Sequence, residues 1–248
     1  MKRLYEYSLK DVGEIRNRPK ERLIMMLRSI TFAAVLGLWT AFTLAGSVWA
    51  VLFLLGPNSI TRLDVVRSEN TMLELVLVFL CGGGLWGLGI SRLMNADIKS
   101  MVKVCAVSWT ATVLAFVLLV VFLGNSFGGF SRINVLPYFR HSIHYNFLSI
   151  FVPAIGIITA INAYVVTGKL GLHHLKKPAG LYAGIMAALG FLTVGLILLH
   201  GLRWEVGRPV YGKYGMLLIL LICSVGATLA GGMALGWALD KSRIRLNG

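Results

Sequence analysis

Residues 72–91, MLELVLVFLCGGGLWGLGIS, decide the fold class of this chain. A run of this length with one charge, Glu74, is long enough for a helix to cross about 30 Å of hydrocarbon. Five further segments have the same character: residues 30–56, 101–124, 147–168, 180–202 and 215–239. Of the 24 basic and 10 acidic residues, only Lys103 and Glu74 fall within the six segments. The sequence therefore predicts an all-α integral membrane protein built as a six-helix transmembrane bundle.

The composition of the 248 residues excludes several other classes of protein. Hydrophobic residues make up 57% of the chain and charged residues only 14%, whereas a soluble domain carries about 25% charge. The net charge of +14 resembles that of a nucleic-acid binder, but the charges lie in the connections between apolar runs. A β-barrel would need strands of about ten residues with alternating polarity. We therefore expect helices in lipid and no nucleic-acid partner.

The Lys and Arg residues of the connections predict the orientation. With the N-terminus in the cytoplasm, 17 of the 24 basic residues lie on the inner side and seven on the outer side. This divides the chain into a basic cytoplasmic or interfacial segment (1–29), a membrane domain (30–239) and a basic cytoplasmic tail (240–248). Both termini are therefore predicted to be cytoplasmic.

The first segment, 1–29, has the pattern of a short amphipathic interfacial helix. Its apolar residues Leu9, Val12 and Ile15 share one face, beside several basic side chains. Basic residues at a membrane surface interact favourably with anionic lipid headgroups, by about 1 kcal/mol each. We expect this segment to lie on the cytoplasmic leaflet and to dock a partner protein, or to serve only as a topology anchor.

Small residues at intervals of four predict the faces through which helices pack in lipid. The pairs are Gly83 with Gly87 in the second span and Gly232 with Gly236 in the sixth. Such faces hold a bundle together, and they can also meet another subunit or close around a lipid or pigment tail.

The polar residues within the spans are mostly uncharged, and the two charged ones, Glu74 and Lys103, lie near span ends. Ser108, Thr110 and Thr112 lie in the third span and Asn162 in the fourth. An unpaired amide is costly in lipid, so we expect Asn162 to bond to another helix. Charge-driven pumps place ionisable groups deep in the membrane, so a pump with its own proton relay is not expected.

The remaining chemistry gathers on the predicted outer side. His141 and His144 precede the fourth span and His200 ends the fifth, in a pattern that can bind haem, a chlorophyll magnesium or a metal ion. A quinone headgroup or another polar substrate is a second possibility. The interpretation that the sequence favours over both is that these residues only populate the interfacial belt. The nearby polar candidates are Glu74, Arg203 and Glu205.

No P-loop, GxSxG or HExxH motif occurs in the chain, which disfavours an enzyme. The sequence favours a transport-type membrane subunit, a permease-like bundle that works with separate energising or partner subunits. The alternatives are an accessory subunit of a respiratory, photosynthetic or secretory complex and a haem- or metal-binding redox protein. In outline, with a cytoplasmic N-terminal segment and six spans, the chain is similar to the membrane subunits of ABC-type exporters. Since it contains no N-x-S/T glycosylation site, we expect a bacterial inner membrane, or a thylakoid or organellar one.

Overall fold

The computed structural model describes residues 19–55, 69–126, 143–206 and 213–246. This part of the chain contains helices and no strands; the long helices are α2 (Pro19–Leu55), α3 (Glu69–Met94), α4 (Ile98–Ser126), α5 (Ile143–Lys169), α6 (Lys176–Val206) and α7 (Lys213–Leu246). A short 3-10 helix, η5 (His173–Leu175), precedes α6. All six long helices are apolar enough to cross a membrane. This confirms the prediction of an all-α chain with six membrane-spanning helices.

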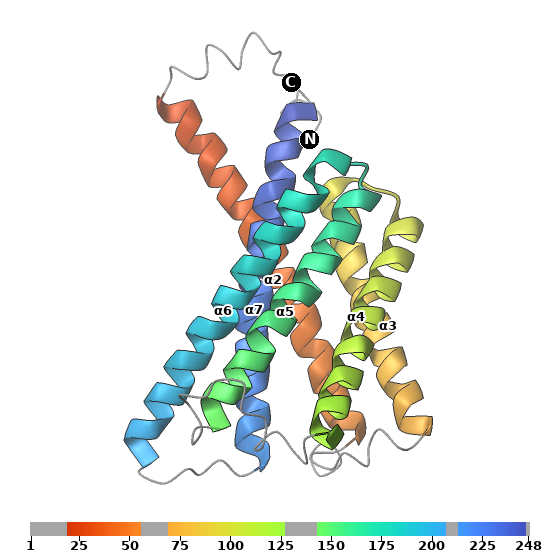
Figure 1. Ribbon diagram of the computed structural model, residues 1–248. Coiled ribbons are helices and arrows are strands. Elements are labelled where there is room, and N and C mark those ends of the chain that lie inside the picture. Colours follow the sequence, from red (N-terminus) through yellow and green to blue (C-terminus); the bar gives the residue numbers. More distant parts are fainter. Residues whose placement is uncertain (1–18, 56–68, 127–142, 207–212, 247–248) are drawn as a thin grey trace.

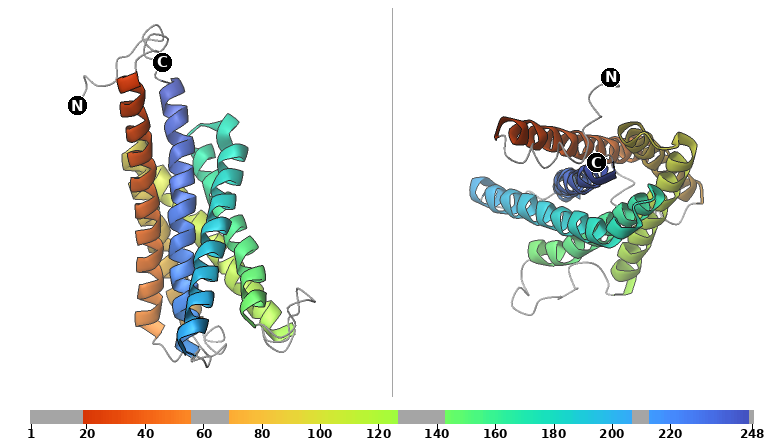
Figure 2. Two further views of the ribbon diagram at one scale, coloured as in Figure 1. Left: turned by 90° about the vertical axis from the view of Figure 1, so that its left-hand side faces the viewer. Right: turned by 90° about the horizontal axis from the view of Figure 1, so that it is seen from above.

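The six helices pack as a closed ring in the order α2, α7, α6, α5, α4, α3 and back to α2. Viewed along the bundle, α7 lies between α2 and α6, while α3 and α4 stand together at one side (Figure 2). In the perpendicular view α2 and α6 run obliquely in opposite directions and cross (Figure 1). The first and last of the described helices, α2 and α7, are therefore neighbours in space.

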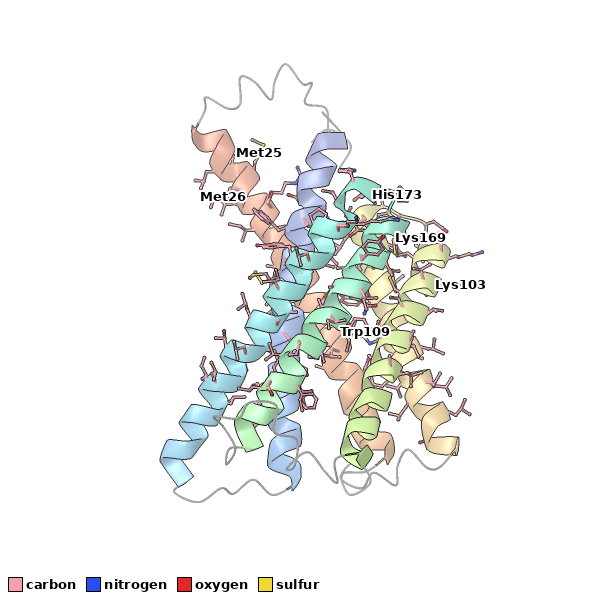
Figure 3. All side chains as sticks on the ribbon, viewed as in Figure 1. Met25, Met26, Lys103, Trp109, Lys169 and His173 are labelled. Atoms are coloured by element: carbon pink, nitrogen blue, oxygen red, sulfur yellow. The ribbon has the colours of Figure 1, made fainter. Side chains whose placement is uncertain are left out.

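Helix α2 begins at Pro19, eleven residues before the predicted span at 30. Proline fits the first helical position because its missing N–H has no partner there in any case. With 37 residues, the helix is about 55 Å long, well beyond the ~30 Å of a hydrocarbon core. Its early residues Met25 and Met26 lie at the same end of the bundle as Lys103, Lys169 and His173 (Figure 3), and we call this the basic end. The predicted interfacial helix at Leu9–Ile15 lies outside the described residues.

Two tight turns join helices at the basic end. Asn95 (φ 52°) ends α3, and the carboxylate of Asp97 accepts a hydrogen bond from the backbone N–H of Ser100 at 3.1 Å, which caps the start of α4. Gly171 (φ 78°) ends α5 in a Schellman turn closed by a bond from the N–H of Leu172 to the carbonyl of Thr167 at 3.1 Å. These short links place α3 beside α4 and α5 beside α6.

The buried side chains form two apolar clusters. The larger contains residues of all six helices, among them Leu36, Trp86, Trp109, Val166 and Leu239. The smaller, centred on Phe151, Phe191 and Ile219, contains only residues of α5, α6 and α7. The outward faces carry exposed large apolar side chains along the described helices, which suits lipid contact; they include Leu38, Phe42, Leu77, Val107, Ile157, Leu181 and Leu189.

Candidate functional site

At several helix interfaces of this ring, backbone atoms of one helix come close to the backbone of the next. On α7, a Cβ added at Gly232 would lie 2.9 Å from the Cα of Gly37 in α2, and one at Gly236 would lie 2.9 Å from the Cα of Ala33. The two helices approach this closely only because these positions are glycine. Thus the Gly232–Gly236 pair packs against α2 of the same chain.

The same close packing links α5, α6 and α7. A Cβ at Gly184 in α6 would meet the carbonyl oxygen of Gly156 in α5 at 2.7 Å. A Cβ at Gly190 would meet the carbonyl oxygen of Gly226 in α7 at 2.9 Å. Together with the α2–α7 contact, these interfaces join α2, α5, α6 and α7 into one unit, which we call the four-helix body.

Helices α3 and α4 form a second unit of this kind, which we call the α3–α4 hairpin. A Cβ at Gly83 would lie 2.8 Å from the carbonyl oxygen of Cys105, and one at Gly87 would lie 2.9 Å from that of Met101. The predicted Gly83–Gly87 face therefore packs α3 against its neighbour in sequence.

The hairpin meets the body along α4 and α5 through hydrogen bonds, and we call this junction the α4–α5 seam. The Ser108 hydroxyl of α4 donates to Oδ1 of Asn162 in α5 at 2.8 Å. The Asn162 amide donates to the hydroxyl oxygen of Thr112 at 2.9 Å and to the carbonyl of Ile158 at 2.9 Å. Asn162 is 5% exposed, and its carbonyl and both amide hydrogens are used. The structure thus gives Asn162 the interhelical partners that its polarity requires.

The hairpin meets the body a second time along α2 and α3, at the α2–α3 seam. The indole N–H of Trp86 in α3 donates to the hydroxyl oxygen of Thr40 in α2 at 2.9 Å. The indole N–H of Trp39 in α2 donates to the carbonyl of Leu85 at 3.1 Å. Glycines of α3 also face α2, but the nearest atoms to an added Cβ at Gly89 all belong to the Trp39 side chain, and at Gly82 the nearest backbone atom of α2, the carbonyl oxygen of Thr43, is 3.8 Å away. Both seams therefore consist of side-chain contacts and neutral hydrogen bonds.

Trp109 of α4 packs against Trp86 between these two seams. The ring centroids are 5.2 Å apart and the planes are inclined by 53°, a tilted arrangement that aromatic pairs favour. Trp109 is 6% exposed, yet its indole N–H finds no acceptor among the described residues. Figure 3 shows its side chain part-way along the bundle.

One carboxylate is buried at the basic end. The hydroxyl of Ser29 in α2 donates to Oδ2 of Asp240 in α7, which is 5% exposed. The sequence places Asp240 at the start of the predicted cytoplasmic tail, but α7 continues to Leu246 and carries this side chain against α2. The contact adds a polar tie to the α2–α7 interface.

The predicted outer group is placed only in part. His144 stands at the start of α5 and His200 near the end of α6, two neighbouring helices, both at the end opposite the basic end (Figure 1). His141 lies outside the described residues, as do the side chains of His144, His200, Arg203 and Glu205. Glu74 is exposed on α3. The haem, chlorophyll or metal interpretation of this group stays a prediction.

Sequence reasoning named Asn162, Ser108 and Thr112 but passed over the tryptophans Trp86 and Trp109. Their positions inside the apolar runs gave one usable signal, because tryptophan prefers the membrane–water interface. A tryptophan deep in a span needs a partner for its N–H. Comparison with known proteins adds no assignment: no family model, curated protein or solved structure matches this chain.

Proposed function

We propose that this chain is a transport-type membrane subunit in which the α3–α4 hairpin moves as a unit against the four-helix body. The observation that carries the proposal is the contrast between the interfaces. Within the hairpin and within the body, helix backbones meet at glycine. Between the two units the contacts are hydrogen bonds and side chains, at the α4–α5 and α2–α3 seams.

The backbone contacts within each unit and the side-chain contacts at the seams differ in how they respond when one helix slides along another. Where two backbones touch, as at Gly232 and Gly37, sliding of one helix along the other brings larger side chains against the neighbouring backbone. A side-chain hydrogen bond in a membrane contributes only about 0.6 kcal/mol on average and can change partners. Transporters commonly alternate by rigid-body rocking of one group of helices against another. The seams are where such rocking is least costly.

The chemistry of the seams favours an uncharged cargo. Their polar groups are the hydroxyls of Thr40, Ser108 and Thr112, the amide of Asn162 and the tryptophan indoles, all of them neutral. Proton relays and many ion pathways in membranes are marked by ionisable side chains, which these seams lack among the described residues. We therefore assign to the seams an uncharged or amphipathic molecule, with the driving energy supplied by a separate subunit.

The basic end faces the cytoplasm in this proposal, which places both termini there. The turns at Asp97 and Gly171 and the early residues of α2 then lie at the cytoplasmic leaflet. Basic residues of this end, including Lys103, Lys169 and Lys177, interact there with anionic headgroups. Residues 1–29 supply the interfacial contact with lipid and with the partner subunit, and the membrane is the bacterial inner membrane or an organellar equivalent.

Purification from its native membrane in a mild detergent tests the function. We expect a colourless assembly that contains a second, nucleotide-hydrolysing subunit, whose association is lost when the basic residues of 1–29 are replaced by Glu. A Soret band that disappears in His144→Ala or His200→Ala would show a redox protein instead. A large native complex without any hydrolase would identify an accessory subunit. Either of these results overturns the transport proposal.

A further inference from the structure

Three tryptophans near the two seams differ in what their indole N–H groups bind. Trp39 donates to the carbonyl of Leu85 at 3.1 Å and Trp86 donates to the hydroxyl oxygen of Thr40 at 2.9 Å. Trp109 is as deeply buried as Trp86, but its N–H meets no acceptor in the described part of the chain. Leaving a buried donor unpaired is unfavourable by about 1–3 kcal/mol, and hydrocarbon offers no water to satisfy it.

The polar groups nearest to Trp109 in sequence are already engaged. Its neighbour Ser108 gives its hydroxyl hydrogen to Asn162. The two amide hydrogens of Asn162 go to Thr112 and Ile158, and the Thr112 hydroxyl hydrogen goes to the backbone carbonyl of Ser108 at 2.9 Å. The α4–α5 seam is thus satisfied without Trp109, which leaves the indole as an additional donor beside it.

The indole ring is held in place by its surroundings. Trp86 packs against it in a tilted arrangement, with ring centroids 5.2 Å apart. A Cβ at Gly83 would lie 2.7 Å from the Cβ of Trp109, so the base of the side chain is tightly packed against α3. Since the ring is fixed in this way, the acceptor has to come to the N–H.

Thr110 is the second buried polar group without a partner among the described side chains, but it does not point to a ligand. It lies two residues beyond Ser108, about 200° around the helix, and so faces away from the seam. A threonine hydroxyl in a helix can also turn to the carbonyl four residues earlier, here Ala106. An indole N–H has no such local acceptor, so Trp109 alone calls for an outside one.

We infer that Trp109 is a ligand-binding residue whose indole N–H donates a hydrogen bond to an acceptor oxygen, a carbonyl or hydroxyl of an uncharged amphipathic molecule held beside the α4–α5 seam. A water molecule bound at the same place could also accept this hydrogen bond through its oxygen, and the experiment below distinguishes the two. The role of the ligand as cargo rests on the proposed function, whereas its binding at Trp109 does not.

Indole N–H resonances in a protein labelled with 15N-tryptophan read this site directly. The chain has 6 Trp, and single Trp→Phe variants assign the signals. The protein in micelles is titrated with 2-decanone, whose carbonyl accepts a hydrogen bond, and in parallel with decane, which cannot accept one. We expect 2-decanone to shift the Trp109 signal downfield and saturably, decane to leave it in place, and neither to move the Trp86 signal.

A binding measurement provides the second readout. We expect 2-decanone to raise the thermal unfolding midpoint of the wild type and of Trp86→Phe, and to bind Trp109→Phe roughly threefold more weakly, the loss expected for one hydrogen bond of about 0.6 kcal/mol in a membrane. Equal shifts with decane, or undiminished binding to Trp109→Phe, would overturn the inference. So would rapid exchange of the Trp109 N–H in D2O without any effect of 2-decanone, which would identify water as the acceptor. If 2-decanone shifts the Trp109 signal but the chain purifies without a hydrolase, the binding site is supported and only the transport function is contradicted.

Discussion

Replacing Gly83 by Ala tests the backbone packing on which the division into two units depends. The new Cβ would lie 2.8 Å from the carbonyl oxygen of Cys105 and 2.9 Å from the Cα of Ala106. Carbon atoms pack best at about 3.5–4.0 Å, so α3 and α4 would have to separate by about half an ångström or more. The Cβ of Trp109 is nearer still, at 2.7 Å, and neither a Cβ nor a backbone atom can rotate away as the end of a side chain can.

Overpacking of this kind destabilises a protein by typically 1–3 kcal/mol. The higher helix propensity of Ala does not offset this cost, because membrane helices remain helical when their packing is lost. We therefore expect Gly83→Ala to lower the free energy of unfolding by about 1–3 kcal/mol, a roughly fivefold to hundredfold change in the equilibrium constant.

Unfolding of the purified protein by increasing SDS fractions in mixed micelles measures this difference. Gly46→Ala is the matched control, because a Cβ at Gly46 in α2 would meet nothing within 4 Å. We expect Gly46→Ala to unfold like the wild type. Equal unfolding free energies for Gly83→Ala and Gly46→Ala would refute the close backbone contact of α3 with α4.

Three further substitutions test the seams and Trp109 by the same assay. Asn162→Leu removes the hydrogen bonds across the α4–α5 seam and should destabilise the protein by about 1–2 kcal/mol. Thr167→Val is the control in the same helix and should have less effect, because the Thr167 hydroxyl bonds to the backbone of its own helix. Equal effects of the two substitutions would contradict an interhelical role for Asn162. Trp86→Phe loses the bond to Thr40 and should destabilise by about 0.5–1.5 kcal/mol. Trp109→Phe, which removes an unpaired donor, should be neutral or stabilising without ligand, and a larger loss than in Trp86→Phe would be inconsistent with a free N–H.

The number of spans could be predicted from the sequence because each apolar run is limited by charges or turn residues. The residues at which the helices begin and end were harder to predict from the sequence. Helix α2 starts at Pro19 because Leu23–Leu27 is apolar enough to continue the helix past Arg28, and a single basic residue does not interrupt a helix. Helix α4 starts at Ile98 because Asp97 caps it, a local signal that the hydropathy pattern conceals.

The arrangement of the helices could not be predicted. In a soluble bundle an apolar stripe marks the buried face, but lipid is as apolar as leucine, so both faces of a membrane helix look alike. Gly232 and Gly236 reveal a packing face in sequence, yet nothing in their spacing indicates that α2 covers it. The difference between Trp86 and Trp109 is likewise invisible, since it depends on Thr40, which lies 46 residues from Trp86.

The central claim is that two rigid units meet at adaptable seams, and double electron–electron resonance in lipid bilayers tests it most directly. Spin labels replace exposed residues in a background in which the exposed Cys81 is changed to Ser: Val107 with Ile185 spans hairpin and body, and Leu38 with Ile185 lies within the body. We expect two distance populations for the first pair and one for the second. Asn162→Leu should change the ratio of the two populations by roughly sevenfold, for about 1.2 kcal/mol of lost seam bonds. A single, equally narrow distance for both pairs, unchanged by Asn162→Leu, would contradict the account.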